Sequence, residues 1–227
     1  MRTSPLFTRS RGAVAGVAVA AMSLLAACGS MAPGKSGLGF FVTSVGPGDG
    51  GNLGGLAGAD AHCQKLATAA GAGSRTWRAY LSAQPTPGAV GVNARDRIGK
   101  GPWMNAKGVV VATDVDNLHT ANSLSQATAL SETGALVNGR LDKPNTHDVL
   151  TGSQPNGTYI AGAANSTCAN WTQNDQGAAM VGHHDRMGLD DSVPAKSWNS
   201  SHQSRGCSGD QLKASGGAGL YYCFAAD

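Results

Sequence analysis

The sequence predicts an α+β fold in which one early helix accompanies an irregular antiparallel sheet of short strands joined by long loops. The chain has 227 residues, of which 33 are glycine, and it contains thirteen aspartates but one glutamate, Glu132. Asp favours turns and helix caps whereas Glu favours helix interiors, so this composition indicates a loop-rich protein. Only one long segment, near the start of the chain, has a clear helical periodicity.

The first half of the chain contains the clearest patterns. Residues 38–45 form a β-branched and aromatic run that predicts a strand. Residues 55–70 place apolar side chains at helical spacing and predict a helix that stops at Gly71. Residues 76–82 alternate apolar and polar side chains, as in a half-buried strand, and residues 103–112 predict a hairpin.

The second half is more polar and less regular. A weak helical pattern covers residues 127–136. The remaining expected strands are short and lie at residues 147–151, 158–161, 168–172, 178–181 and 220–225. Because strands and helices do not alternate regularly along the chain, the order favours α+β over a doubly wound parallel fold.

The first 27 residues have the features of a secretory signal. Arg2, Arg9 and Arg11 precede an apolar run at 13–27. This run is too short and wrongly flanked for a stable membrane span, but it suits the hydrophobic region of a signal peptide. We therefore expect residues 1–27 to be removed on export.

The apolar run ends in the residues LAAC, which resemble the lipobox of bacterial lipoproteins, with Cys28 in the lipidated position. The resemblance implies cleavage before Cys28 and a membrane anchor of two or more acyl chains, which is durable. Residues 28–37 then form a lipidated tether, and residues 38–227 form one domain. The expected localisation is the bacterial cell envelope, lipid-anchored at the outer membrane or cell surface.

Composition argues against nucleic acid and nucleotide as partners. The chain carries 17 basic and 14 acidic residues, but three arginines lie in the signal, so the mature chain is close to neutral. Residues 46–51 match the dinucleotide-binding pattern G-x-G-x-x-G. The predicted helix begins too late to direct its N-terminus at a phosphate there, so we interpret these glycines as a strand-to-helix loop.

Four cysteines remain in the expected domain: Cys63, Cys168, Cys207 and Cys223. An even number in an exported chain predicts two disulfides, for which three pairings are possible. A cysteine-based zinc site is the competing interpretation, but the chain has no C-x-x-C spacing.

Several motifs resemble those of the endostatin domain, in the same order along the chain. They are GADAHC at 58–63, RAYLS at 78–82, GSQPNG at 152–157, CANWT at 168–172 and CF at 223–224. The resemblance extends from Leu38 to Ala226 and is weak in the middle. It implies a C-type-lectin-like fold with disulfides Cys63–Cys223 and Cys168–Cys207, and we expect Asp60 to be a structural hydrogen-bonding residue.

The candidate ligand-binding residues lie between Cys168 and Cys207, in the long inner segment of this fold. Trp198, Asn199 and His202 could present an aromatic ring beside amide and imidazole groups, which suits sugars or peptides. The alternative is that the polar residues hydrogen-bond the loop to itself, with Trp198 packed beneath it. The candidate residues are Trp198, Asn199, His202, His183, His184 and Asp185.

We assign no metal or other cofactor from the sequence. The tripeptide at 154–156 resembles a calcium-binding motif of C-type lectins but precedes Cys168, and Ser200 stands where a calcium-ligating Asp is needed. The zinc site of endostatins requires N-terminal histidines that this chain lacks before His62. One histidine with Asp185 or Asp191 is a further possible metal site.

The sequence therefore favours a non-catalytic envelope protein that binds an extracellular protein or glycan. The resemblance to bacterial lipoproteins, some of which are adhesins, implies a host matrix protein as one possible ligand. We assign no catalytic residues, because the chain lacks the usual hydrolase motifs. The alternatives are a structural envelope lipoprotein without an external ligand and a metal-assisted enzyme. A second candidate surface for anionic glycans, with a solvated face as its alternative, consists of Arg75, Arg78, Arg95, Arg97, Lys100 and Lys107.

Overall fold

The computed structural model describes residues 1–4, 37–162 and 165–227 of the chain. The chain divides into two units, Met1–Met31 and Ala32–Asp227, and the elements below belong to the second. The expected lipidation site at Cys28, with nearly all of the signal and tether, lies outside the described residues. Within the described part, every helix is too short or too polar to span a bilayer.

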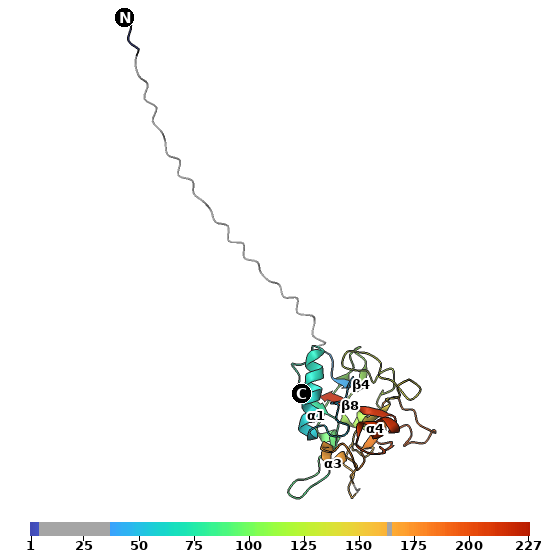
Figure 1. Ribbon diagram of the computed structural model, residues 1–227. Coiled ribbons are helices and arrows are strands. Elements are labelled where there is room, and N and C mark those ends of the chain that lie inside the picture. Colours follow the sequence, from blue (N-terminus) through green and yellow to red (C-terminus); the bar gives the residue numbers. More distant parts are fainter. Residues whose placement is uncertain (5–36, 163–164) are drawn as a thin grey trace. The chain divides into compact units, whose positions relative to one another are not determined.

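The second unit is an α+β fold, as the sequence predicts (Figure 1). Its six-stranded sheet centres on the last strand, β8 (Gly217–Ala225). The C-terminal half of β8 pairs antiparallel with both β1 (Phe40–Val42) and β2 (Trp77–Ala79). The early strands of the chain are therefore joined to its end.

The sheet continues from the other part of β8 into the strands that carry the site. Strand β5 (Asp148–Leu150) pairs parallel with β8, so the sheet is not wholly antiparallel. Antiparallel pairs then add β6 (Met180–His183) and β7 (His202–Gln203). The resulting order β5-β6-β7 places the ends of three distant segments side by side.

The expected early helix is α1 (Gly55–Ala69), and it follows Gly54, whose φ of 73° favours glycine. The expected hairpin consists of β3 (Trp103–Met104) and β4 (Val110–Ala112). A short 3₁₀ turn, η1 (Ala94–Asp96), precedes it. These elements agree with their sequence patterns because their apolar faces are buried against the sheet.

Three further helices are not predicted by periodicity. They are α2 (Val115–Thr120), α3 (Cys168–Trp171) and α4 (Gly209–Ser215). Helix α4 begins with a capping box in which Ser208 and Gln211 bond each other's backbone N–H groups. The S-x-x-Q pattern was therefore a usable signal, whereas the short length of α4 hides its apolar stripe.

Three local predictions are wrong. Residues 127–136, all of them described, form turns and isolated bridges and no helix. Tyr159 forms an isolated bridge with Ser153 in place of the strand expected at 158–161. Residues 168–172 form α3 in place of a strand, with positive φ at four consecutive residues.

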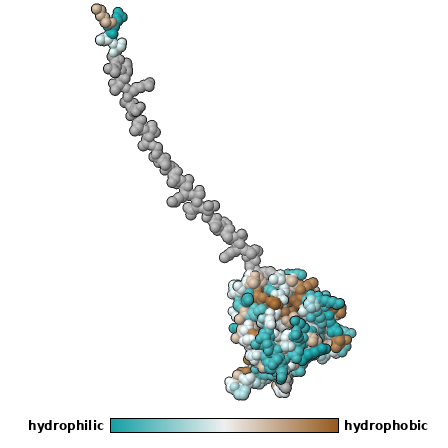
Figure 2. All heavy atoms as spheres, viewed as in Figure 1, coloured by the Kyte–Doolittle hydropathy of each residue, from teal (hydrophilic) through white to brown (hydrophobic). Residues whose placement is uncertain are grey.

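Two apolar cores occupy opposite faces of the sheet. Alternate residues of β8 point to opposite faces, so Tyr221 and Cys223 join one core while Tyr222 and Phe224 join the other. The first core lies under α1, and the second is rich in aromatic rings. Outside these cores, the visible surface is mostly hydrophilic with separate apolar patches (Figure 2).

Two disulfides connect the described elements. Cys63 of α1 is bonded to Cys223 of β8, and Cys168 of α3 is bonded to Cys207. This is the pairing that the endostatin resemblance implies. The first bond attaches the early helix to the central strand, and the second closes the segment that contains β6 and β7.

Candidate functional site

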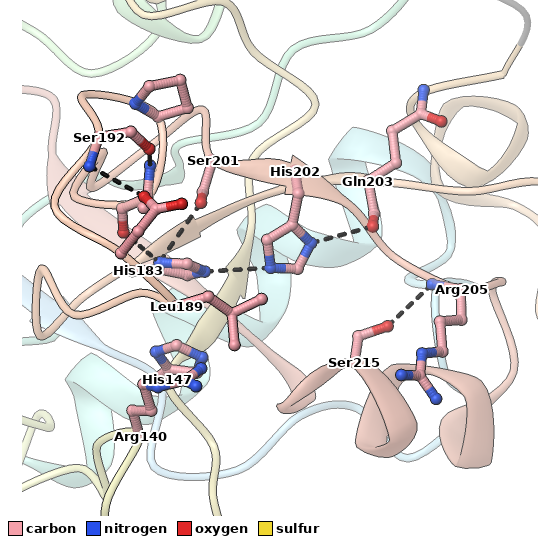
Figure 3. Close-up of a pocket in the computed structure, with 13 residues that line it drawn as sticks. Arg140, His147, His183, Leu189, Ser192, Ser201, His202, Gln203, Arg205 and Ser215 are labelled. Atoms are coloured by element: carbon pink, nitrogen blue, oxygen red, sulfur yellow. Dashed lines mark hydrogen bonds between the residues drawn. The ribbon is translucent and has the colours of Figure 1, made fainter.

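A pocket of about 510 Å³ opens beside β6 and β7 (Figure 3). Its walls combine imidazole rings, hydroxyl groups, two guanidinium groups and apolar side chains. The residues that carry its chemistry are Arg140, His147, His183, Leu189, Ser192, Pro194, Ser201, His202, Gln203 and Arg205. The long segment between β6 and β7 supplies several of them.

Three neighbouring strands bring three histidines to the floor of this pocket. His147 immediately precedes β5, His183 ends β6 and His202 begins β7. The register pairs Asp148 with His183, and Val181 with His202. The pairing of β5 with β8 is irregular between Asp148 and Val149, next to the point where His147 and Asp148 enter the site.

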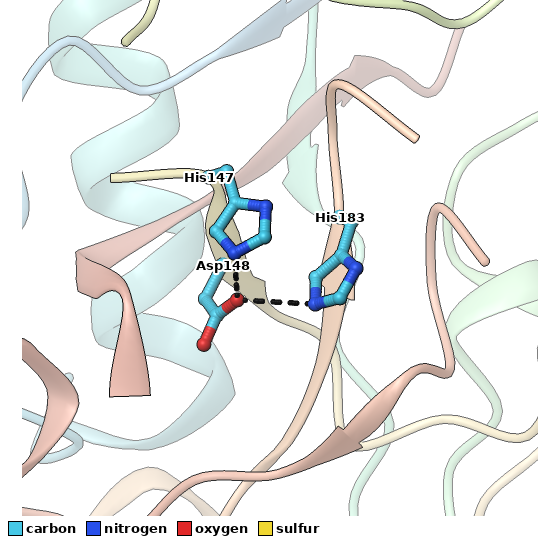
Figure 4. A group of neighbouring side chains, drawn as sticks. All are labelled: His147, Asp148 and His183. Carbon is cyan, nitrogen blue, oxygen red and sulfur yellow. Dashed lines mark ion pairs between the residues drawn. The ribbon is translucent and has the colours of Figure 1, made fainter. Parts of the chain in front are cut away.

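The Asp148 carboxylate lies behind the three rings. Its Oδ1 is 3.1 Å from His147 Nε2 and 3.3 Å from His183 Nε2 (Figure 4). His202 Nε2 is 3.6 Å from the same oxygen and 3.1 Å from His183 Nε2. We call these four residues the imidazole–carboxylate cluster: His147, Asp148, His183 and His202.

The second nitrogen of each ring in the cluster is held by an acceptor. His183 Nδ1 donates to the Ala195 carbonyl at 2.7 Å, and His202 Nδ1 donates to the Gln203 carbonyl at 3.0 Å. His147 Nδ1 donates to Asp185 Oδ1 at 3.2 Å. Since carbonyls and carboxylates only accept, each Nδ1 carries a proton, and a ring that is also protonated at Nε2 can donate to Asp148 or to a neighbouring ring.

Both carboxylates of the site remain ionised despite their burial. Burial raises the pKa of Asp148, but the nearby imidazoles of His183 and His202 lower it further, so its pKa is below the ordinary value. Burial likewise opposes ionisation of Asp185. Its bonds with His147 and two backbone N–H groups outweigh that effect and lower its pKa to about 2.

The donor types in the cluster suit a borderline divalent cation. Imidazole nitrogen is a common ligand of zinc and other first-row transition metals, while calcium and magnesium prefer oxygen ligands alone. Nδ1 bonds to a carboxylate or a carbonyl are also the usual supports of metal-bound histidines. The residues present could therefore hold one such ion at the pocket floor.

The cluster does not provide a serine nucleophile with a general base. Ser201 Oγ is 3.3 Å from His183 Nδ1, and His183 Nε2 faces Asp148, which superficially resembles a Ser-His-Asp arrangement. However, His183 Nδ1 already donates to the Ala195 carbonyl. A protonated nitrogen cannot accept the hydroxyl proton of Ser201, so this arrangement does not activate it.

The structure separates the two adjacent histidines, as an extended backbone predicts. His183 enters the cluster, whereas His184 is buried on the other side and contacts the Asn138 carbonyl at 3.1 Å. Burial lowers the pKa of His184 and keeps the ring neutral. Asp185 does not reach the pocket but orients His147, so its role is to position another residue.

Trp198 and Asn199 do not form the surface that the sequence suggested. Trp198 is 4% exposed and packs against the rings of Tyr80 and Tyr222. Asn199 is 1% exposed, and its amide donates to Tyr80 Oη and to the carbonyls of the 154–155 segment. For these two residues the alternative expectation, a packed and hydrogen-bonded loop, describes the structure.

Gly182 in β6 explains how the loop reaches this buried position. A Cβ atom at Gly182 would lie 1.9 Å from the Trp198 carbonyl oxygen, so only glycine permits the approach. The backbone N–H of the following His183 then donates to Ser197 O at 2.8 Å. The loop is thereby fixed across β6, with its aromatic ring directed into the core.

Sequence reasoning missed His147 and Asp148, which precede the Cys168–Cys207 segment, and the pocket arginines Arg140 and Arg205. No motif spacing connects them with His183, because a sheet and not a helix brings them together. Of the basic residues proposed as a glycan surface, four form internal ion pairs with aspartates: Arg75, Arg78, Arg95 and Arg97.

Comparison with models of known protein families gives no match to this chain, and no curated protein sequence matches it either.

Proposed function

We propose that this chain is a lipid-anchored protein of the bacterial cell envelope that binds an extracellular protein or glycan without catalysis. The observation that carries the proposal is the pocket of about 510 Å³ in the segment where the sequence places the binding region. Its size is within the range of small-ligand sites, and it would hold one sugar unit or one peptide side chain.

The chemistry of the pocket wall supports recognition of a polar, anionic group with an apolar face. Arg140 and Arg205 line the pocket, and their guanidinium groups form no ion pair with any of the described residues. Guanidinium groups bind carboxylates and sulfates in bidentate geometry. Leu189 offers an apolar contact, and Ser192 and Gln203 offer hydrogen bonds.

The C-type-lectin-like, endostatin-like nature of the domain is part of the same proposal. The two disulfides have the pairing expected for that family, and the strand–helix–strand order of β1, α1 and β2 agrees with it. Asp60 joins α1 to β2 as a structural residue, which also agrees. These features support the assignment through topology and not through sequence similarity over the whole chain.

The anchor is proposed from the lipobox alone. Labelled palmitate should be incorporated into the wild-type chain and lost in Cys28→Ala, because the thiol is the acylated atom. If palmitate is still incorporated into Cys28→Ala, the proposed anchor is wrong. This result would not bear on the proposed binding pocket.

Binding is best tested with the full chain, exported and purified in detergent, on an array of glycans and matrix proteins. We expect binding to anionic members of the array, with a loss of tenfold or more in Arg205→Ala and Gln203→Ala. Neither substitution alters the imidazole–carboxylate cluster. Lys65→Ala, which removes an exposed cation on α1, is the matched control and should bind as the wild type does.

An array without any bound member would favour the structural envelope lipoprotein. Metal-assisted catalysis is the second candidate, because the imidazole–carboxylate cluster offers metal ligands beside a pocket. It requires an exchangeable coordination position in addition to the protein ligands. Turnover of a bound glycan or peptide, abolished by chelation and restored by zinc, would establish this alternative.

A further inference from the structure

His147, Asp148 and His183 each offer one ligand atom, and these three atoms all lie within 4.8 Å of one another. Ligand atoms that lie ~2.0–2.1 Å from one tetrahedral ion are about 3.3–3.4 Å from one another. Asp148 Oδ1 is 3.1 Å from His147 Nε2 and 3.3 Å from His183 Nε2, which is within about 0.3 Å of that spacing. His202 Nε2 lies beside the group, 3.6 Å from the same oxygen.

The Nε2 atoms of His147 and His183 both lie against one oxygen of the Asp148 carboxylate. The Asp148 carboxylate is about 1% exposed, and neither of its oxygens accepts an aligned hydrogen bond from the described residues. A buried anion without aligned donors is costly, and a cation at the centre would compensate it.

The surrounding residues orient the ligands as the second shell of a metal site does. Asp185 accepts from His147, and it is itself held by the backbone N–H groups of Arg140 and Met187. Two backbone carbonyls hold His183 and His202. Such partners fix the tautomer and direction of each ring before an ion arrives.

We propose that His147, Asp148 and His183 of the imidazole–carboxylate cluster bind one Zn²⁺ ion. Two imidazole nitrogens and one carboxylate oxygen are ligands that suit zinc, which has no geometric demand from its d electrons. Three protein ligands leave a fourth position for water or for a group in the pocket. The ion therefore connects β5 and β6 and fixes the pocket floor, independently of whether the pocket binds an extracellular ligand.

The direct test is zinc titration of the full chain, purified in detergent and freed of metal by chelation. We expect one zinc per chain and a higher thermal midpoint with zinc. Cobalt in place of zinc should give the intense visible absorption of a tetrahedral site. These readouts require neither an activity nor a known ligand.

Variants separate the ligands from general packing. His183→Gln removes one ligand and should weaken zinc binding at least tenfold while the chain stays folded. Asp185→Asn should weaken it about 10- to 100-fold through loss of ligand orientation. His62→Gln is the matched control, because His62 lies on α1 and contacts the Val45 carbonyl.

Asp148→Asn distinguishes a metal site from a network of protons. If the cluster is a zinc site, the metal-free variant should be as stable as the metal-free wild type, or more stable, because a buried charge is gone. Zinc binding should nevertheless fall at least tenfold. If imidazolium ions pair with Asp148 instead, the same variant loses stability without metal, and that result overturns the proposal.

Two further results would contradict the zinc site. One is a folded wild-type chain that takes up no zinc from micromolar solution. The other is equal zinc affinity in His183→Gln and His62→Gln, which would place the ion elsewhere in the chain.

Discussion

At the scale of single residues, burial decides which polar side chains are available for binding. Tyr80 lies between the site loop and the core. Its hydroxyl donates to His119 Nε2 at 2.7 Å and accepts from Asn199 Nδ2 at 3.0 Å. One hydrogen-bond partner of Asn199 is thus in the first half of the chain. No local pattern near Asn199 indicates that its amide already forms hydrogen bonds within the protein.

Trp198→Ala should destabilise the protein and not selectively remove binding. Loss of a buried Trp costs about 3–5 kcal/mol through lost transfer energy and a cavity. Urea unfolding followed by circular dichroism measures this loss. Leu189→Ala, at an 88% exposed position on the pocket rim, is the control and should change stability by less than about 0.5 kcal/mol.

A stable Trp198→Ala protein that fails to bind would contradict this assignment. The Trp198 ring would then contact the ligand, as the sequence suggested.

The pKa of His119 gives a residue-scale dependence on pH. Burial lowers this pKa below the ordinary 6.5, and the ring is neutral because Nδ1 donates to Val115 O while Nε2 accepts from Tyr80. The unfolded chain therefore binds more protons than the folded chain as pH falls below about 6.5. The contribution to stability is complete above that pH and is lost as pH decreases toward the folded-state pKa.

His119→Gln should consequently reduce the loss of thermal midpoint between pH 7.5 and pH 5. Part of the acid dependence should remain, because burial also lowers the pKa of His184. An unchanged difference between the two pH values would show that His119 is equally protonated in the folded and unfolded chains.

At the scale of elements, a single carboxylate joins α1 to β2. Asp60 of α1 accepts from Arg78 and Arg97 at 2.9 and 2.7 Å, and from the backbone N–H of Ala79 at 2.9 Å. The helix contributes the acid and the neighbouring strand contributes a backbone donor, so the bond sets the position of one element on the other. This agrees with the structural role predicted for Asp60.

Asp60→Ala should lower the free energy of unfolding by about 3 kcal/mol, at the low end for a broken buried pair because Arg78 is half exposed. Asp60→Asn should lose less, because its side-chain oxygen can still accept from Ala79. Equilibrium unfolding in urea compares the two. If the two variants lose the same free energy of unfolding, the charge of Asp60 contributes more to the contact between α1 and β2 than its bond with the Ala79 backbone.

At the scale of the whole molecule, the disulfides restrict the unfolded chain over very different lengths. Cys63 and Cys223 are separated by 160 positions, and Cys168 and Cys207 by 39. The chain-entropy relation gives about 5 kcal/mol for the first closure and about 4 kcal/mol for the second. The first bond also joins the helix to the central strand of the sheet.

Removing the first bond with Cys63→Ala and Cys223→Ala should therefore cost about 1 kcal/mol more than removing the second with Cys168→Ala and Cys207→Ala. Thermal or urea unfolding of the two double variants measures the difference. A larger loss for the second pair would show that local strain in the 168–207 segment outweighs the length of the closed loop.

Much of the outer framework could be predicted from the sequence. The α+β class, α1, the β3–β4 hairpin and the positions of β1 and β2 all follow from local patterns. These succeed because their apolar periodicity is decided within a few residues. Helix α4 and strand β7 are too short for such a pattern, and the backbone of α3 takes left-handed conformations that residue preferences do not favour.

The site itself depended on tertiary structure. The sequence determined the residue types and an even set of cysteines consistent with two bonds. It could not show that β5, β6 and β7 are neighbours, because strand order arises from non-local pairing. That pairing directs His147, Asp148, His183 and His202 to one point, and it buries Trp198 where the sequence suggested an exposed ring.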